Sequence, residues 1–309
     1  DLFGPAAPEL RIVEDLLRKS VADDPSEVAR PMADLLEAGG KRIRPALVVL
    51  CAMCGQYDRD SALAAAIGAE IIHAATLVHD DVIDRASTRR GRPTVAASLG
   101  DEPAIVIGDY YFAKAYEWAA RTEVPEAVAI LAGAVMEICA GEVRQQAIRY
   151  RYSTTVEEYT RRIEAKTGAL LAACCDIGAL LGRLDEDRRA ALRTYGRSLG
   201  LAFQIADDVL DYTGTEREVG KPIGHDILEG FATLPFMLAS IHIDDDRHLT
   251  EREATGIVEE VRTNHGPERA LEYAHEHASA ARDQLKVLAP CESVDALAAL
   301  TDYVVSRKL

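Results

Sequence analysis

Helical periodicity is the feature of this sequence that most constrains its fold. Apolar residues recur three and four positions apart, as at Val128, Leu131, Val135 and Ile138, so they share one face of a helix. Runs that alternate apolar and polar residues, which are typical of strands, are nearly absent. The pattern therefore predicts an all-α protein. Helices are expected at residues 8–20, 27–38, 43–55, 60–84, 103–121, 125–149, 156–165, 167–183, 187–212, 231–242, 250–264, 267–288 and 292–306.

We expect a single domain over residues 1–309. Nearly half of the residues are apolar, which is enough for one large core. No Gly/Ser-rich linker, low-complexity block or internal repeat divides the chain. Breaks between helices are expected at glycine and proline, for example at Arg90–Pro93 and Gly214–Pro222. Long helices of this kind form a bundle, and facing helices line the central apolar cavity of such a bundle.

The net charge of −16 argues against nucleic acid and against an anionic membrane surface as partners. Small anionic substrates remain compatible with this charge if metal cations bridge them. No apolar run reaches the roughly 18 residues of a membrane-spanning helix, so we expect no transmembrane segment. The pair Cys51-x-x-Cys54 lacks a second pair at zinc spacing, and the six cysteines lie in apolar stretches. We therefore expect reduced thiols and a cytoplasmic location.

Two acidic motifs of the form DDxxD carry the strongest chemical signal. They consist of Asp80, Asp81 and Asp84, and of Asp207, Asp208 and Asp211. Three carboxylates in one helical turn repel each other, and the dipole at a helix C-terminus disfavours negative charge. A hard cation removes this conflict, because Mg²⁺ takes a few carboxylate oxygens and completes its shell with water and phosphate. The alternative is a solvated acidic face, but each motif follows a strongly apolar segment.

A similar pair, Asp23-Asp24, precedes Pro25 at an expected helix start, where helix capping explains it better. The basic residues complement the two acidic motifs. Three of the few lysines, at 41, 166 and 221, lie in segments punctuated by Gly, Pro or Thr, and a basic group at 89–92 follows the first motif. Backbone freed by glycine beside fixed cations suits phosphate oxygens. Each segment alone could be an ordinary charged loop, but together they favour diphosphate binding.

With these residues the chain resembles the trans-prenyl diphosphate synthases, or polyprenyl synthetases, over about residues 35–240. The matching segments are GGKRIRP (39–45), HAATLVHDDVID (73–84), RRGRPT (89–94), GD (108–109), KTG (166–168), FQIADDVLD (203–211), GKPIGHD (220–226) and EGFATLP (229–235). The resemblance implies an all-α bundle of the isoprenoid synthase type around a central apolar cavity, and a homodimer.

The resemblance also implies the reaction. Isopentenyl diphosphate would be condensed head to tail with an allylic prenyl diphosphate, in all-trans chain elongation that releases diphosphate. About three Mg²⁺ ions would hold the allylic diphosphate and polarise its C–O bond, which ionises to an allylic cation. The metal ligands implied are Asp80, Asp84 and Asp207, with Asp81, Asp208 and Asp211 in support.

The same resemblance assigns substrate contacts by motif position. Isopentenyl diphosphate would be bound by Lys41, Arg44, His73 and Arg90. The allylic diphosphate would be contacted by Arg89, Lys166 and Lys221. Thr167 and Gln204 would lie near the allylic cation, where their dipoles could stabilise it.

The two histidines of the first motif differ in their expected roles. A lone histidine on an apolar helix is more often a core residue, but His73 shares the helix face of Asp80 and is expected to bind substrate. His79 lies about 100° around the helix from Asp80 and is expected to be structural.

Residue 231 departs from the family pattern. The family commonly has lysine where Phe231 stands, and that lysine contacts the allylic diphosphate. Some relatives with longer products carry an apolar residue there, so the departure does not indicate inactivity. It does predict a weaker contact with the allylic diphosphate.

Product length in this family depends on the residues just before the first acidic motif, where bulky aromatics shorten the product. Ala75 and Thr76 are small, so products beyond geranylgeranyl are expected, in the range from hexaprenyl to octaprenyl. A deeper cavity floor could come from Tyr110, Tyr111, Phe112 or Met136, with ordinary core packing as the alternative.

Three alternative functions are compared with this one. They are a geranylgeranyl diphosphate synthase, a terpene cyclase, and a non-catalytic subunit of a heteromeric synthase. A cyclase usually carries a different second metal motif, and a non-catalytic subunit usually loses aspartates, whereas this chain keeps all six. Contact with the membrane is expected only during release of the apolar product.

Overall fold

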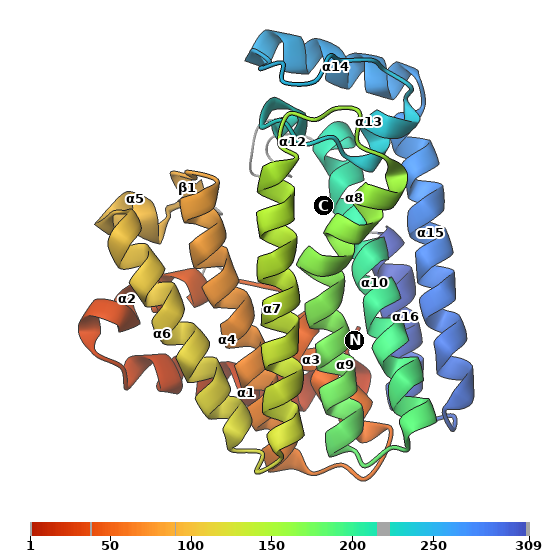
Figure 1. The fold of residues 1–309 in the computed structure, drawn as a ribbon. Helices are drawn as coiled ribbons and strands as arrows, with labels where there is room; N and C mark the ends of the chain where they lie inside the picture. Colours follow the sequence, from red (N-terminus) through yellow and green to blue (C-terminus); the bar gives the residue numbers. More distant parts are fainter. Residues whose placement is uncertain (1, 38, 90, 215–222, 307–309) are drawn as a thin grey trace. The chain divides into compact units, whose positions relative to one another are not determined.

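The computed structural model describes residues 2–37, 39–89, 91–214 and 223–306, which are helical almost throughout (Figure 1). The expected all-α class is confirmed. Within these residues the only strands are β1 (Thr88–Arg89) and β2 (Arg92–Pro93), which pair antiparallel with Thr88 opposite Pro93.

The α-helices, in chain order, are α1 (Ala7–Ala22), α2 (Ser26–Glu37), α3 (Ile43–Met53), α4 (Arg59–Ile83), α5 (Val95–Leu99), α6 (Asp101–Ala120), α7 (Pro125–Ala147), α8 (Val156–Ile163), α9 (Ala169–Leu181), α10 (Glu186–Thr213), α12 (His225–Leu228), α13 (Leu234–Leu238), α14 (Glu251–Thr263), α15 (Gly266–Gln284) and α16 (Glu292–Ser306). Short 3₁₀ turns occur at η1 (Gly4–Ala6) and η3 (Leu285–Val287). A π-helical turn, η2 (Glu164–Gly168), joins α8 to α9.

The chain groups into two compact units, each drawn from several stretches. The first unit comprises Asp1–Val135, Ala173–Leu192 and Leu288–Leu297. The second comprises Met136–Ala172, Arg193–Val287 and Ala298–Leu309. Helices α7, α9, α10 and α16 each begin in one unit and end in the other. The single domain expected over 1–309 stays a prediction.

Helix α4 forms the core of the first unit. Its residues from Ala62 to Ile72 are all buried, because alanine, leucine and isoleucine cover every side of the helix. Contrary to the expectation from sequence, α4 is long and apolar enough to pass as a membrane span, but 78% of its most apolar 18-residue window is buried inside the protein. Burial of this extent is typical of the core helix of a soluble protein.

Small residues let the helices of the first unit approach closely. A Cβ atom on Gly68 of α4 would lie 2.9 Å from the carbonyl oxygen of Ala115 in α6. A Cβ atom on Gly178 of α9 would lie 2.4 Å from the carbonyl oxygen of Val48 in α3. Both separations are below van der Waals contact, so the two helix pairs depend on glycine for their spacing.

The second unit has its own apolar core. Leu201, Ile205 and Val209 on one side of α10 pack with Leu234 of α13 and Ala270 of α15. A further cluster around Tyr212 and Phe236 lies beside it. The apolar stripe of α10 therefore positions the second acidic motif, which occupies the end of the same helix.

Three segments differ from the sequence-based prediction. The helix predicted over 231–242 is only α13, because Pro235 is tolerated in a first turn and Ser240 adopts a left-handed backbone (φ 57°). The short helices α5 and α12 were not predicted. The break expected at Arg90–Pro93 contains β2, and the one at Gly214–Pro222 lies mostly outside the described residues.

Candidate active site

The first acidic motif lies at the C-terminal end of α4. Asp81 is buried (3% exposed), whereas Asp80 is half-buried and Asp84, the C-cap residue, is exposed. The guanidinium of Arg89, carried by β1, donates to Asp81 from Nε (2.9 Å to Oδ1) and from Nη2 (2.8 Å to Oδ1). Burial raises the pKa of Asp81, and the charge of Arg89 opposes that rise. The hairpin thus supplies a counter-ion for the buried carboxylate of the motif.

The ion pair of Asp81 and Arg89 lines a cavity of about 140 Å³ in the first unit. Arg30 and Arg92 also line it, so the cavity beside the first motif is rich in guanidinium groups. Arg92 donates to the carbonyl oxygen of Asp34 (3.2 Å). Arg90, which was expected to bind isopentenyl diphosphate, lies outside the described residues.

In the segment GGKRIRP, Arg42 forms ion pairs that anchor the segment, although no role was predicted for it from the sequence. Arg42 adopts a left-handed backbone (φ 51°) as the N-cap of α3, a conformation that costs a non-glycine residue about 1–2 kcal/mol. Its guanidinium binds Glu14 (3.0 Å) and the nearly buried Glu70 (2.8 Å). Lys41 is exposed and Arg44 half-buried on either side of this anchor.

The two histidines singled out from the sequence lie on different faces of α4. His73 is half-buried, and its carbonyl accepts a bond from Thr76 Oγ1 (2.7 Å). His79 packs against α6: its ring lies 5.5 Å from that of Phe112, and its Nε2 is 3.0 Å from the carbonyl oxygen of Ile105. A Cβ atom on Gly108 would lie 2.1 Å from His79 Nε2, so the glycine makes room for the ring. These contacts agree with the structural role expected for His79.

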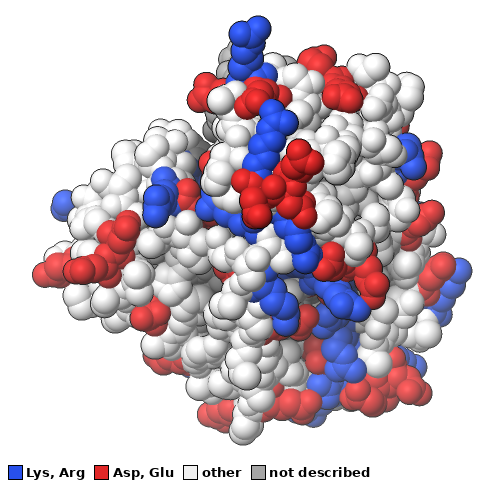
Figure 2. All heavy atoms as spheres, turned by 45° about the horizontal axis from the view of Figure 1, so that its top comes forward, with Lys and Arg blue, Asp and Glu red and all other residues white. Residues whose placement is uncertain are grey.

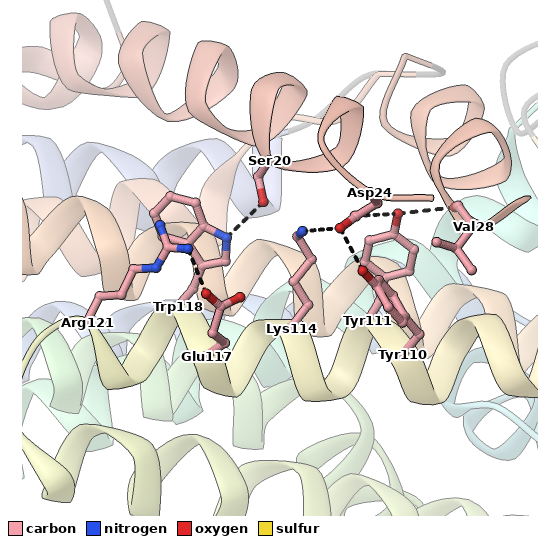
Figure 3. A network of polar contacts seen from close by, with 9 residues as sticks. All are labelled: Ser20, Asp24, Val28, Tyr110, Tyr111, Lys114, Glu117, Trp118 and Arg121. Atoms are coloured by element: carbon pink, nitrogen blue, oxygen red, sulfur yellow. Dashed lines mark hydrogen bonds and ion pairs between the residues drawn. The ribbon is translucent and has the colours of Figure 1, made fainter. Parts of the chain in front are cut away.

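Two of the three aromatic residues proposed as a cavity floor, Tyr110 and Tyr111, have polar partners. Figure 3 shows the hydroxyl groups of Tyr110 and Tyr111 directed at Asp24, at 2.7 and 3.2 Å. Lys114 Nζ lies 2.5 Å from the same carboxylate. The side chain of Asp24 therefore joins the α1–α2 connection to α6, instead of serving mainly as the helix cap expected from sequence. Met136 is 73% exposed in the single chain, whereas Ala75 is fully buried.

The second acidic motif lies at the end of α10 in the second unit. Asp208 and Asp211 are buried (4% and 1% exposed), and Asp207 is half-buried. Burial and the nearby Asp226 raise the pKa of Asp208 to about 7. Asp211 Oδ2 accepts a hydrogen bond from the backbone N–H of Asp226 (3.1 Å), which fixes the segment GHD at the start of α12. Lys221 of that loop lies outside the described residues.

A hydrogen-bonded chain connects the motif KTG to the second acidic motif. Thr167 Oγ1 donates to Gln204 Oε1 (2.7 Å), and Gln204 Nε2 donates to Asp208 Oδ1 (2.9 Å). The other oxygen of Asp208 accepts from the buried Tyr159 hydroxyl (2.7 Å). The π-helical turn η2 carries Thr167 and Lys166, and such turns recur at functional sites. Tyr159 was not predicted, since no sequence signal marks a tyrosine seven residues before the motif KTG.

Lys166 and Phe231 complete the predicted residues of the second unit. Lys166 Nζ lies 3.3 Å from Glu142 Oε2 of α7. Phe231 is half-buried, and the guanidinium carbons of Arg149 and Arg162 lie 5.5 and 5.9 Å from its ring centre. Two cations thus lie beside the position where the family commonly has lysine.

Charged side chains of both signs occur together in both units. On the face in Figure 2, Lys and Arg side chains lie among Asp and Glu side chains instead of forming a broad basic patch. Among the described residues, no group of three His, Cys, Asp or Glu side chains is arranged to hold a metal ion by itself. In each motif, however, buried carboxylates have protein donors, and half-buried or exposed carboxylates stand beside them. Carboxylates of the second kind suit Mg²⁺, which keeps water and phosphate in its shell.

Comparisons with known proteins identify the family of this chain. The sequence profile of the family named polyprenyl synthetase matches residues 25–263. Heptaprenyl diphosphate synthase component 2 of Geobacillus stearothermophilus is 42% identical over 248 residues, covering 80% of this chain and 77% of the relative. A short chain isoprenyl diphosphate synthase of Methanothermobacter thermautotrophicus is 35% identical and covers 96% of each chain.

A solved structure extends the likeness to three dimensions. The polyprenyl synthase of Caulobacter crescentus, described as complexed with calcium and isoprenyl diphosphate, superposes with a TM-score of 0.92 at 34% identity. The match covers 98% of this chain and 96% of that one. The helical fold is therefore that of the isoprenoid synthases, and the chain belongs to the polyprenyl synthetase family of prenyltransferases.

Proposed function

We propose that the chain is a Mg²⁺-dependent trans-polyprenyl diphosphate synthase that condenses isopentenyl diphosphate with an allylic prenyl diphosphate. The observation that carries this proposal is the division of each acidic motif into buried and solvent-accessible carboxylates. Asp81, Asp208 and Asp211 are buried with protein donors, whereas Asp80, Asp84 and Asp207 retain exposure. The accessible three are the residues that the family resemblance implies as metal ligands.

The donor set fits Mg²⁺, which would supply Lewis-acid polarisation of the allylic C–O bond when bound. Arg89 holds Asp81 in place, and Tyr159 and Gln204 hold Asp208, so neither carboxylate has to be reoriented when substrate binds. Thr167 and Gln204, which are hydrogen-bonded to each other (2.7 Å), would supply oxygen dipoles for the developing allylic cation. The C–O bond breaks, the alkene carbon of isopentenyl diphosphate forms the new C–C bond, and a proton passes to the released diphosphate.

Assay of the purified chain with Mg²⁺, isopentenyl diphosphate and farnesyl diphosphate tests the reaction. We expect elongated prenyl diphosphates with wild-type chain, and at least about a hundredfold loss for Asp80→Asn, since the charge on a metal ligand contributes several kcal/mol to such chemistry. Asp15→Asn provides a matched control, because this exposed aspartate of α1 lies outside both motifs and does not line the cavity beside the first motif. Absence of elongation with every allylic primer would refute the proposal, and release of a cyclic hydrocarbon would indicate a cyclase.

For product length we propose the range from hexaprenyl to octaprenyl, with a geranylgeranyl product as the alternative. Ala75 is fully buried and Thr76 half-buried, and neither has the bulky aromatic side chain that shortens the product in this family. The relative named for heptaprenyl falls in this range, whereas the one named short chain does not. Products labelled with radioactive isopentenyl diphosphate are expected to shorten in Ala75→Phe and Thr76→Phe. Unchanged products in both folded variants would contradict the proposal.

A second candidate is a subunit of a heteromeric synthase, because one relative is named component 2 of heptaprenyl diphosphate synthase. We favour a homodimer that is active alone, since all six aspartates of the two motifs are present. Light scattering after size-exclusion chromatography measures the assembly, and activity of that species separates the two candidates. We also propose a cytoplasmic location, with contact to the membrane during product release.

A further inference from the structure

The family commonly has a lysine for the allylic diphosphate at residue 231. In this chain, hydrogen bonds connect the backbone of residue 231 to the second acidic motif. The backbone N–H of Phe231 donates to the carbonyl oxygen of Asp226 (2.8 Å). The N–H of Asp226 donates in turn to the carboxylate of Asp211 (3.1 Å). The position of the missing lysine is therefore well defined, although its charge is absent.

Two arginines from other segments flank the ring of Phe231, and they differ in their charge partners. Arg149 donates to the carbonyl oxygen of Glu229 (2.8 Å) and forms an ion pair with the carboxylate of the same residue. Its positive charge is therefore neutralised. Arg162 of α8 instead donates to the carbonyl oxygen of Ala232 (2.8 Å), which carries no formal charge. A guanidinium has five donors, so this bond leaves Arg162 able to bind a phosphate.

Arg162 is also placed beside the second acidic motif. Its guanidinium carbon lies 5.3 Å from the ring centre of Tyr159, whose hydroxyl donates to Asp208 (2.7 Å). The positive charge of Arg162 lowers the pKa of Asp208, against the larger effects of burial and Asp226 that raise it. Arg162 is half-buried, and two aromatic rings restrict its guanidinium.

We propose that Arg162 provides the positive charge for the allylic diphosphate that a lysine at position 231 provides elsewhere in the family. Phe231 would then pack against the guanidinium of Arg162. In this chain α8 would carry the positive charge that the family commonly carries at position 231. The planar guanidinium binds phosphate oxygens in pairs and stacks on aromatic rings, which a lysine does less well. This inference rests on the proposed function, because it assumes that an allylic diphosphate binds at the second motif.

The test measures binding without turnover. Farnesyl thiolodiphosphate, an unreactive allylic analogue, is titrated calorimetrically into wild type and Arg162→Gln in the presence of Mg²⁺. We expect about ten- to hundredfold weaker binding in the variant, as for loss of one charge-assisted hydrogen bond. Arg161→Gln, on the same helix but 71% exposed, is the matched control and should change the affinity less than about threefold.

A second experiment tests whether a lysine at position 231 can replace Arg162. In a Phe231→Lys background the same Arg162→Gln substitution should weaken binding less than about threefold, because the lysine takes over the contact. Arg162→Met, which keeps the stem beside Tyr159, replaces the glutamine variant if that one does not fold. Affinity unchanged by loss of Arg162, or equally reduced with and without the lysine, would overturn the inference. The proposed function fails separately, if wild type elongates no primer.

Discussion

Replacement of Asp24 by asparagine isolates the energetics of the network in Figure 3. The Asp24 side chain is 5% exposed and that of Lys114 is 12% exposed, so the ion pair between them is largely removed from water. The asparagine keeps an oxygen that can accept from Tyr110 and Tyr111. The substitution therefore changes one quantity above all, the charge that faces Lys114.

The burial of this ion pair determines how much unfolding free energy the substitution should cost. Removing one partner of a buried ion pair costs about 3–5 kcal/mol, because the other charge remains without compensation. Lys114 retains some exposure and can turn its ammonium toward water, so we expect the lower end, about 3 kcal/mol of unfolding free energy. If Lys114 is also replaced, by methionine, no charge is left buried. The double variant should then lie within about 1 kcal/mol of wild type.

Urea denaturation followed by far-ultraviolet circular dichroism measures these free energies by linear extrapolation. The control is Glu117→Gln, which removes the partner of Arg121 in a pair whose side chains are 59% and 50% exposed. That pair should be worth less than about 0.5 kcal/mol. A loss below about 1 kcal/mol for Asp24→Asn, or a double variant as unstable as the single one, would refute the argument from burial.

Two further predictions concern helix packing and high pH. Gly178→Ala should lower the unfolding free energy by about 1–3 kcal/mol, since its Cβ would lie 2.4 Å from the carbonyl oxygen of Val48, whereas Gly256→Ala, with no atom within 4 Å, should raise it by about 0.5–1 kcal/mol. Urea midpoints of both variants check this, and equal signs would contradict it. Burial raises the pKa of Tyr152 to about 12. Its neutral form is favoured in the folded state, so its contribution is complete below pH 10 and is lost as the pH rises toward 12. Unfolding free energies from pH 9 to 12 should fall less steeply in Tyr152→Phe, and parallel curves would refute this.

The helical elements could be predicted from the sequence because their signals are local. The three- and four-residue spacing of apolar side chains marked α4, α7 and α10 to within two residues at each end. The prediction of a helix over 231–242 failed because Pro235 lies in the first turn of α13, and apolar periodicity takes no account of proline. For α5, the N-cap threonine, Thr94, is a signal that could have been used.

The candidate site was predictable only in part, since motifs name residues but not their neighbours. The resemblance separated supporting from ligating aspartates, and the burial of Asp81, Asp208 and Asp211 is compatible with that separation. Tyr159, Arg42 and Arg162 were missed. Each acts through a contact with a residue far along the chain, and a single sequence does not encode which distant side chains meet.

By itself the sequence determined the helices and the spacing of the carboxylates in the two acidic motifs. Both are properties of residues within one or two helical turns, where spacing alone decides which side chains share a face. The tertiary structure decided which carboxylates are buried against donors, and which arginine at Phe231 keeps its charge for a ligand. Those outcomes depend on burial and on pairing between distant segments, and both quantities arise only when the helices pack.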